Sequence, residues 1–100
     1  KENLYLDPLS HRIYVFSPLG DVYDLPEGAT PVDYAFTVHS DLGLHIKSAK
    51  VNQKQVALSH SLKSGDVVEI VKSKKKQKPN RDWLQFVKSN QVKSKIRKSL

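Results

Sequence analysis

Short apolar runs separated by turn residues fill the first 71 positions of the chain. Residues 13–16 form an unbroken β-branched and aromatic run, which is typical of a strand buried on both faces. Proline and glycine in residues 18–21 supply the chemistry of a tight turn, and residues 22–25 alternate apolar and polar side chains as the partner strand. Later apolar runs predict further strands over residues 46–51, 55–58 and 67–71.

The segment between the second and third strands carries the signals of one short helix. The Thr30 hydroxyl can cap the free N–H groups, Pro31 stands where its missing N–H costs nothing, and Asp33 favours the positive end of the helix dipole. Gly43 is suited to a left-handed cap at the other end. The spacing i, i+3, i+4, i+7 predicts the buried face, namely Val32, Ala35, Phe36 and His39.

The resulting order of elements, β-β-α-β-β-β, predicts an α+β fold. Because the first and last strands are both apolar, we expect them to be central neighbours in a mixed sheet, with one helix packed across one face. This arrangement is the ubiquitin-like β-grasp architecture, and a basic C-terminal helical tail should follow it.

The residues after the last strand are polar and cationic up to Pro79 and then regain helical signals. Trp83 and Val87 would lie on one side of a continuous helix and Ile96 on the other, so two short helices broken near Ser89 fit better than one. The predicted organisation is a linker from a preceding region (residues 1–11), a globular domain (12–73) expected to fold alone, a basic linker (74–80) and a helical extension (81–100). Since Lys1 opens the chain in place of methionine, we interpret the chain as a fragment of a longer protein.

The formal net charge of +7 is unevenly distributed along the chain. Residues 1–71 contain six basic and nine acidic residues, a net charge of −3, whereas residues 72–100 contain eleven basic and one acidic, a net charge of +10. A basic arm of this kind attracts a phosphate backbone or an acidic protein face. The alternative is a solvated linker and helix surface.

Several chemistries are excluded by what the chain lacks. It has no cysteine, so disulfides, thiolate metal sites and a cysteine nucleophile are excluded, which fits a cytoplasmic protein. The four histidines have no metal-binding spacing, no phosphate-binding glycine loop is present, and no apolar run reaches the length of a membrane span. We therefore expect no catalytic residues, no metal and no cofactor in this chain.

The segment of residues 39–47 is the sharpest candidate for binding. His39, Ser40, His45 and Lys47 combine two imidazoles, a hydroxyl and a cation around a glycine turn, and such groups can stack on an exposed base and contact phosphate at a single-stranded RNA end. The alternative is a helix cap with His39 partly packed in the core. Outside this segment, four cations complete the predicted RNA- or partner-binding set, namely Lys74, Lys75, Lys76 and Arg81.

Three stretches together resemble the TGS domain of the RelA/SpoT-type enzymes that make and degrade the alarmone (p)ppGpp. They are Ile13-Tyr-Val-Phe-Ser-Pro-Leu-Gly-Asp21, Leu25-Pro-Glu-Gly-Ala-Thr-Pro-Val-Asp-Tyr-Ala35 and Gly65-Asp-Val-Val-Glu-Ile70. TGS modules also occur in threonyl-tRNA synthetases and Obg-type GTPases, and the Arg81-Asp82-Trp83 extension is what favours the alarmone enzymes.

The resemblance implies a non-catalytic regulatory module within a GTP pyrophosphokinase or ppGpp hydrolase. Such a module would bind the acceptor end of deacylated tRNA on the ribosome, or acyl carrier protein, and relay this to the catalytic domains of the same chain, with no membrane partner. The alternatives are an RNA-docking domain of a tRNA synthetase or GTPase and a pure protein-interaction module. Many relatives carry histidine directly after the glycine matching Gly43. Here Leu44 occupies that position and His45 follows, so His39 becomes the stronger candidate.

Overall fold

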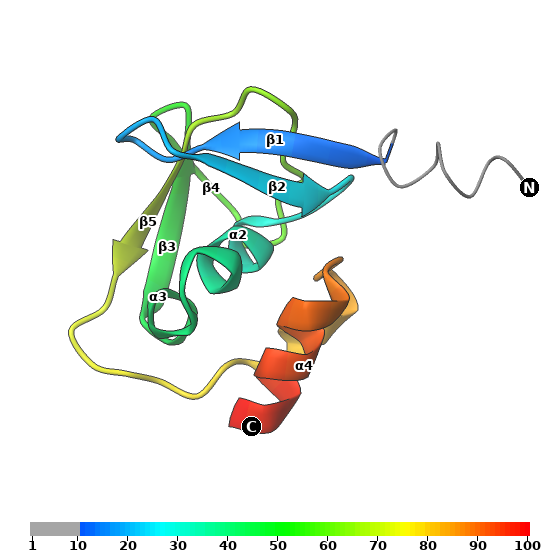
Figure 1. Ribbon diagram of the computed structural model, residues 1–100. Helices are drawn as coiled ribbons and strands as arrows, with labels where there is room; N and C mark the ends of the chain where they lie inside the picture. Colours follow the sequence, from blue (N-terminus) through cyan, green and yellow to red (C-terminus); the bar gives the residue numbers. More distant parts are fainter. Residues whose placement is uncertain (1–10) are drawn as a thin grey trace, which may run out of the picture.

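The computed structural model describes residues 11–100, and all but the last residue of the expected N-terminal linker lies outside this range. Figure 1 shows two small sheets, a central helix beneath them and a helical extension on the far side of that helix. Along the chain the elements are β1 (Arg12–Phe16), β2 (Val22–Pro26), α2 (Pro31–Val38), α3 (Ser40–Leu44), β3 (Ile46–Val51), β4 (Lys54–Val56), β5 (Val68–Lys72), the 3-10 helix η1 (Arg81–Gln85) and α4 (Asn90–Ser99).

The strands form two antiparallel sheets, β1-β2 and β4-β3-β5, so the predicted α+β class is confirmed. The expected single mixed sheet is replaced by these two sheets, which a parallel bridge between Phe16 and Val67 connects. Two backbone bonds next to the bridge reinforce it, from Phe16 N–H to the Asp66 carbonyl (2.8 Å) and from Gly65 N–H to the Tyr14 carbonyl (2.9 Å).

Strand β1 differs from its prediction in one respect. Ile13 and Val15 are buried, whereas Tyr14 is 42% exposed, so the strand alternates between an inner and an outer face. The unbroken apolar run therefore does not mean burial on both sides. Its outer side chains face solvent because no layer covers that side of the hairpin among residues 11–100.

The start of α2 is as predicted. Thr30 is the N-cap, Pro31 opens the helix, and Asp33 completes a capping box by accepting from the Thr30 N–H (2.8 Å) and hydroxyl (2.9 Å). All of residues 31–36 are buried, which requires cover on more than one side of the helix.

Two clusters of apolar side chains provide that cover. Tyr34 belongs to the cluster that α2 shares with the sheets. The predicted stripe of Val32, Ala35 and Phe36 is buried, but it joins a second cluster completed by the extension, through Val87, Val92 and Ile96.

The end of α2 corrects the prediction. The helix stops at Val38, and His39 adopts an extended conformation (φ −169°, ψ 140°) before a second helix begins at Ser40. Gly43 lies within α3 and does not have a positive φ, so it is no left-handed cap. A Cβ added to Gly43 would lie 2.5 Å from the Phe36 ring, so glycine is required there by close packing.

The extension consists of two short helices, η1 and α4, as the opposed apolar stripes predicted. Ser89 is the N-cap of α4, where the break was expected. The buried Asp33 carboxylate accepts from the backbone N–H groups of Lys88 (3.0 Å) and Ser89 (2.8 Å). One carboxylate therefore caps α2 and also fixes the turn that leads into α4.

Candidate functional site

An open depression of about 470 Å³ lies where α3 meets the end of β5. Strand β5 runs antiparallel to β3 with Lys72 opposite Ile46, so the chain leaves the sheet directly beside α3. The side chains around the depression carry imidazole, carboxylate, hydroxyl and ammonium groups. They are His39, Asp41, Leu42, His45, Lys72, Ser73 and Lys74.

The two histidines are fixed by the backbone of Asp41. The Asp41 N–H donates to Nδ1 of His39 (3.0 Å), so this nitrogen carries no proton. Nδ1 of His45 lies 2.8 Å from the Asp41 carbonyl oxygen, which can only accept, so this nitrogen carries the proton. In the neutral form of each ring, these contacts leave opposite groups at Nε2, an N–H donor on His39 and an acceptor on His45.

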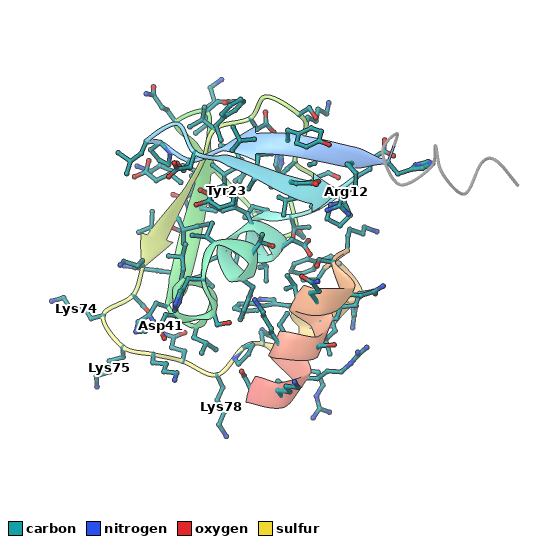
Figure 2. The ribbon with its side chains drawn as sticks, in the orientation of Figure 1. Arg12, Tyr23, Asp41, Lys74, Lys75 and Lys78 are labelled. Carbon is teal, nitrogen blue, oxygen red and sulfur yellow. The ribbon has the colours of Figure 1, made fainter. Side chains whose placement is uncertain are left out.

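The basic linker is anchored to the end of α3. The Ser73 N–H donates to the His45 carbonyl (2.6 Å), and the Gln77 N–H donates to the Leu44 carbonyl (2.9 Å). These bonds satisfy two carbonyls at the end of the helix and hold the lysine run beside the histidines. Figure 2 shows Lys74, Lys75 and Lys78 projecting from the linker away from the domain, with Asp41 on the nearby α3.

The structure brings only some of the predicted binding residues into the depression. His39, His45 and Lys74 line it, whereas Ser40 and the exposed Lys47 do not. The other three predicted cations lie apart from this depression. Lys76 lines a neighbouring hollow of about 350 Å³, Lys75 is exposed on the linker, and Arg81 opens η1.

Sequence reasoning missed Ser73, and it predicts Lys72 only as one of the phosphate contacts over residues 72–78, not as a neighbour of the two histidines. Their place depends on the pairing of β3 with β5, because that pairing puts the end of the last strand next to the start of β3. Only the first and last strands were expected to be neighbours. The His39 prediction also changes, since its side chain is exposed and caps α3, and it is not packed in the core.

A continuous set of contacts leads from α3 to the extension. Gly43 of α3 lies against the Phe36 ring, and that ring meets Trp83 of η1 edge-on, with centroids 6.5 Å apart. The Phe36 carbonyl also accepts from the Lys95 ammonium group (3.1 Å). Phe36 therefore contacts α3 on one side and both extension helices on the other.

Two absences within residues 11–100 bear on other functions. No group of three or more His, Cys, Asp or Glu side chains is arranged to hold a metal ion in this part of the chain. No helix between these limits is long and apolar enough to cross a membrane.

Known proteins that are similar to this chain over nearly all of its length share one kind of activity in their names, the synthesis or hydrolysis of guanosine polyphosphates. A GTP pyrophosphokinase from Myxococcus xanthus is 46% identical over 96% of this chain, and a bifunctional (p)ppGpp synthase/hydrolase RelA from Mycobacterium tuberculosis is 47% identical over 96%. A guanosine-3′,5′-bis(diphosphate) 3′-pyrophosphohydrolase from Aquifex aeolicus is 43% identical over 99%. The chain spans only 12% to 14% of the length of these relatives.

A solved structure and a family model add to this comparison. The crystal structure of a GTP-binding protein from Pyrococcus horikoshii matches 70% of this chain and 23% of its own, with a TM-score of 0.60 and 30% identity. The model of the TGS domain matches residues 13–72, which is the segment from β1 to β5. The chain therefore belongs to the TGS domain family, in the form found in RelA/SpoT-type (p)ppGpp enzymes.

Proposed function

We propose that this chain is a non-catalytic regulatory module of a (p)ppGpp synthetase or hydrolase, which binds the 3′ acceptor end of deacylated tRNA and relays its presence to catalytic domains. The observation that carries the proposal is the depression at α3. It combines two oriented imidazoles with Lys72 and Lys74, and the helix α3 that carries Asp41 and Leu42 packs through Gly43 against Phe36, which contacts the extension.

The chemistry of the depression suits a terminal nucleotide. The donor on His39 and the acceptor on His45 can pair with the two hydroxyls of a free terminal ribose, or an imidazole face can stack on the base. The ammonium groups of Lys72 and Lys74 can contact the adjoining phosphate. An aminoacyl group on the ribose removes one hydroxyl and adds bulk, so the same arrangement would favour the free end.

The relay is supported by the contacts of Phe36. A ligand that moves α3 must move Gly43 against the Phe36 ring, because there is no space between them. Phe36 is in turn held by Trp83 and Lys95, so a displacement reaches both helices of the extension.

The test is the affinity of the chain for deacylated and aminoacylated forms of one tRNA. His39→Ala should reduce the preference for the free end by roughly 1–3 kcal/mol if a base stacks there. His60→Ala is the matched control, since His60 is also exposed but lines a different hollow near Asn52 and Asp66. A folded His39→Ala protein that keeps the full preference would remove the depression from the mechanism.

The cationic linker should contribute affinity without selectivity. Replacing Lys74, Lys75 and Lys76 with Ala should weaken tRNA and unrelated RNA alike, and it should flatten the salt dependence by up to about three phosphate contacts. The predicted phosphate contacts come from residues 72–78 and 93–98. An unchanged salt dependence would show that the linker does not touch the RNA.

Two alternatives rest on other observations. The exposed linker lysines also suit an acidic protein such as acyl carrier protein, and tight binding of that protein with no tRNA binding would favour this alternative. The likeness to a GTP-binding protein favours an RNA-docking domain of a GTPase, although the more extensive identity is with (p)ppGpp enzymes.

The β-grasp architecture and the domain limits are part of the same proposal. The isolated bridge between Phe16 of β1 and Val67, which precedes β5, supports an arrangement with the first and last strands side by side at the centre. We also propose that the globular domain ends at residue 73, that the basic linker begins at residue 74, and that the protein is cytoplasmic. The isolated chain should show no turnover of GTP with ATP or of ppGpp, and measurable turnover would contradict the assignment.

A further inference from the structure

Asp41 supplies a carboxylate to a depression whose other charged groups are cations. Among the residues that the structure describes, it is the only acidic side chain that lines the depression. The backbone of Asp41 orients the two imidazoles, through its N–H to His39 and its carbonyl to His45. Its side chain is exposed and takes no part in those two bonds.

The cations around the Asp41 carboxylate do not neutralise it by direct contact. Within residues 11–100 the ion pairs are Arg12–Asp24 and His11–Glu27, so Lys72 and Lys74 line the same depression without pairing to Asp41. No hydrogen bond between described residues ends on an Asp41 side-chain oxygen either; those near it use its backbone. The carboxylate is therefore available to accept hydrogen bonds from a ligand.

A carboxylate in such a place distinguishes a free ribose from a phosphorylated one. An ionised carboxylate only accepts hydrogen bonds, so ribose hydroxyls can donate to it, whereas a phosphate group brings a negative charge that it repels. Dinucleotide-binding sites use the same chemistry, because an acidic residue there binds the ribose 2′-hydroxyl of NAD and an arginine accommodates the 2′-phosphate of NADP. Lys72 and Lys74 alone would attract phosphate at any position, so only Asp41 can oppose it.

We propose that Asp41 is a specificity-determining residue, which accepts hydrogen bonds from the free hydroxyls of a terminal ribose and disfavours an end that carries a phosphate. The inference rests on the proposed function, because it defines the ligand of the same depression more closely. That ligand is an RNA 3′ end with an unmodified ribose, and RNA fragments that end in a 3′-phosphate are selected against. The Nε2 donor of His39 and the Nε2 acceptor of His45 complete the set of groups for the two hydroxyls.

The alternative role of Asp41 is local, and the chain offers a matched control for it. Asp41 stands in the first turn of α3, where a carboxylate favours the positive end of a helix. Asp82 has the same setting in η1, since it is exposed in the first turn and its N–H donates to Oδ1 of the capping Asn80 (2.8 Å). Asp82→Asn therefore removes the same charge from an equivalent helix start that does not line the depression.

The test is the affinity of the whole chain for one RNA acceptor stem in two forms, with a free 3′ ribose and with a 3′-phosphate. The wild-type chain should prefer the free end, and Asp41→Asn should reduce this preference by roughly tenfold, as the loss of a like charge at close range predicts. Asp41→Glu keeps the charge and should retain most of the preference, and Asp82→Asn should retain all of it. Asp41→Asn also leaves the backbone bonds to the two histidines in place, which the NMR signals of the His39 and His45 amides verify.

Two results would overturn the proposal, and they differ in what else they imply. If the free-end stem shifts the His39 and His45 amides but Asp41→Asn keeps the wild-type preference, the depression binds the end and Asp41 does not select it. If neither stem shifts those amides in the wild-type chain, the proposed function fails together with the role of Asp41.

Discussion

At the scale of single residues, Gly43 of α3 packs against the ring of Phe36 with no room for a side chain. A methyl group on Gly43 would overlap the ring at 2.5 Å, and Phe36 is fully buried and held by Trp83. Gly43→Ala should therefore lower the free energy of unfolding by about 1–3 kcal/mol, as overpacking does. Urea denaturation measures the loss.

A double-mutant cycle can separate overpacking of the Phe36 ring from a general effect of Gly43→Ala on the stability of α3. Phe36→Leu leaves room at the ring edge, so adding it to Gly43→Ala should cost less than the sum of the two single changes. At Gly20 there is open space and a φ of +95°, so Gly20→Ala combined with Phe36→Leu should be additive. Additivity at both glycines would mean that the Gly43–Phe36 contact does not limit the packing.

Tyr34 makes a prediction about alkaline pH. Its burial, with smaller contributions from the nearby Tyr23 and Asp21, raises its pKa from 10.0 to about 12. The folded state thus favours the neutral phenol. The contribution of Tyr34 to the free energy of unfolding is fully present below pH 10 and is lost as the pH rises through about 12. Tyr34→Phe should flatten the fall in unfolding free energy over that range.

The control for Tyr34 is Tyr14→Phe, since Tyr14 is exposed on the hairpin. Unfolding by urea at several pH values measures each protein. If wild type and both variants lose stability with the same slope above pH 10, the neutral Tyr34 phenol does not contribute to stability as described.

At the scale of elements, Asp33 connects α2 to the extension. Its carboxylate accepts from Thr30 on one side and from Lys88 and Ser89 on the other, and it is fully buried. Asp33→Asn replaces one acceptor oxygen with an N–H₂ group facing N–H donors. It should cost on the order of 3 kcal/mol, because hydrogen bonds to a buried charge are lost and donors are left unsatisfied.

The change at Asp33 should also loosen the extension. Hydrogen exchange at the Lys88 and Ser89 amides should accelerate more than exchange in β3. Asp82→Asn is the matched control, since Asp82 is an exposed carboxylate in η1. Equal protection of Lys88 and Ser89 in wild type and Asp33→Asn would contradict the connecting role.

Deleting residues 74–100 tests the domain boundary. The second apolar cluster would lose Val87, Val92 and Ile96, and Phe36 would become partly exposed. A cooperative thermal transition should remain, because the first cluster lies entirely within residues 13–68, but its midpoint should fall. A chain of residues 1–73 without a cooperative transition would show that the extension belongs to the folding unit.

The elements that local chemistry determines could be predicted from the sequence. The cap at Thr30, the strand over residues 46–51 and the break at Ser89 each depend on a few adjacent residues. The direction in which α2 presents Val32, Ala35 and Phe36 could not, because an apolar stripe shows that it is buried but not by which partner.

The candidate site could be predicted only in part, because local chemistry does not show which segments meet. The side-chain chemistry of His39, His45 and Lys74 predicts a binding role, and the structure brings them to one depression. Lys72 and Ser73 enter it through the β3-β5 pairing, which is a long-range contact that no local signal encodes. Gly43 is required because the Phe36 ring, seven residues earlier in the chain, packs against it. No local signal shows this contact, so the sequence predicts a helix cap at Gly43 instead.

At the scale of the whole molecule, ligand binding and its transmission are proposed for different parts of the fold. In the proposed function, the depression at α3 would receive the ligand, the linker would add charge, and the contacts of Phe36 would pass the change to η1 and α4.

Trp83 allows the proposed relay from the α3 depression to the extension to be measured directly. It is the only tryptophan in the chain, so its indole N–H gives one unambiguous NMR signal. On titration with a deacylated tRNA acceptor stem, that signal should shift together with the amides of His39 and His45, with the same midpoint. An acceptor stem whose 3′ end is blocked by phosphate should bind through the linker and leave the Trp83 signal in place. Shifts at His39 and His45 with an unmoved Trp83 signal would contradict the relay.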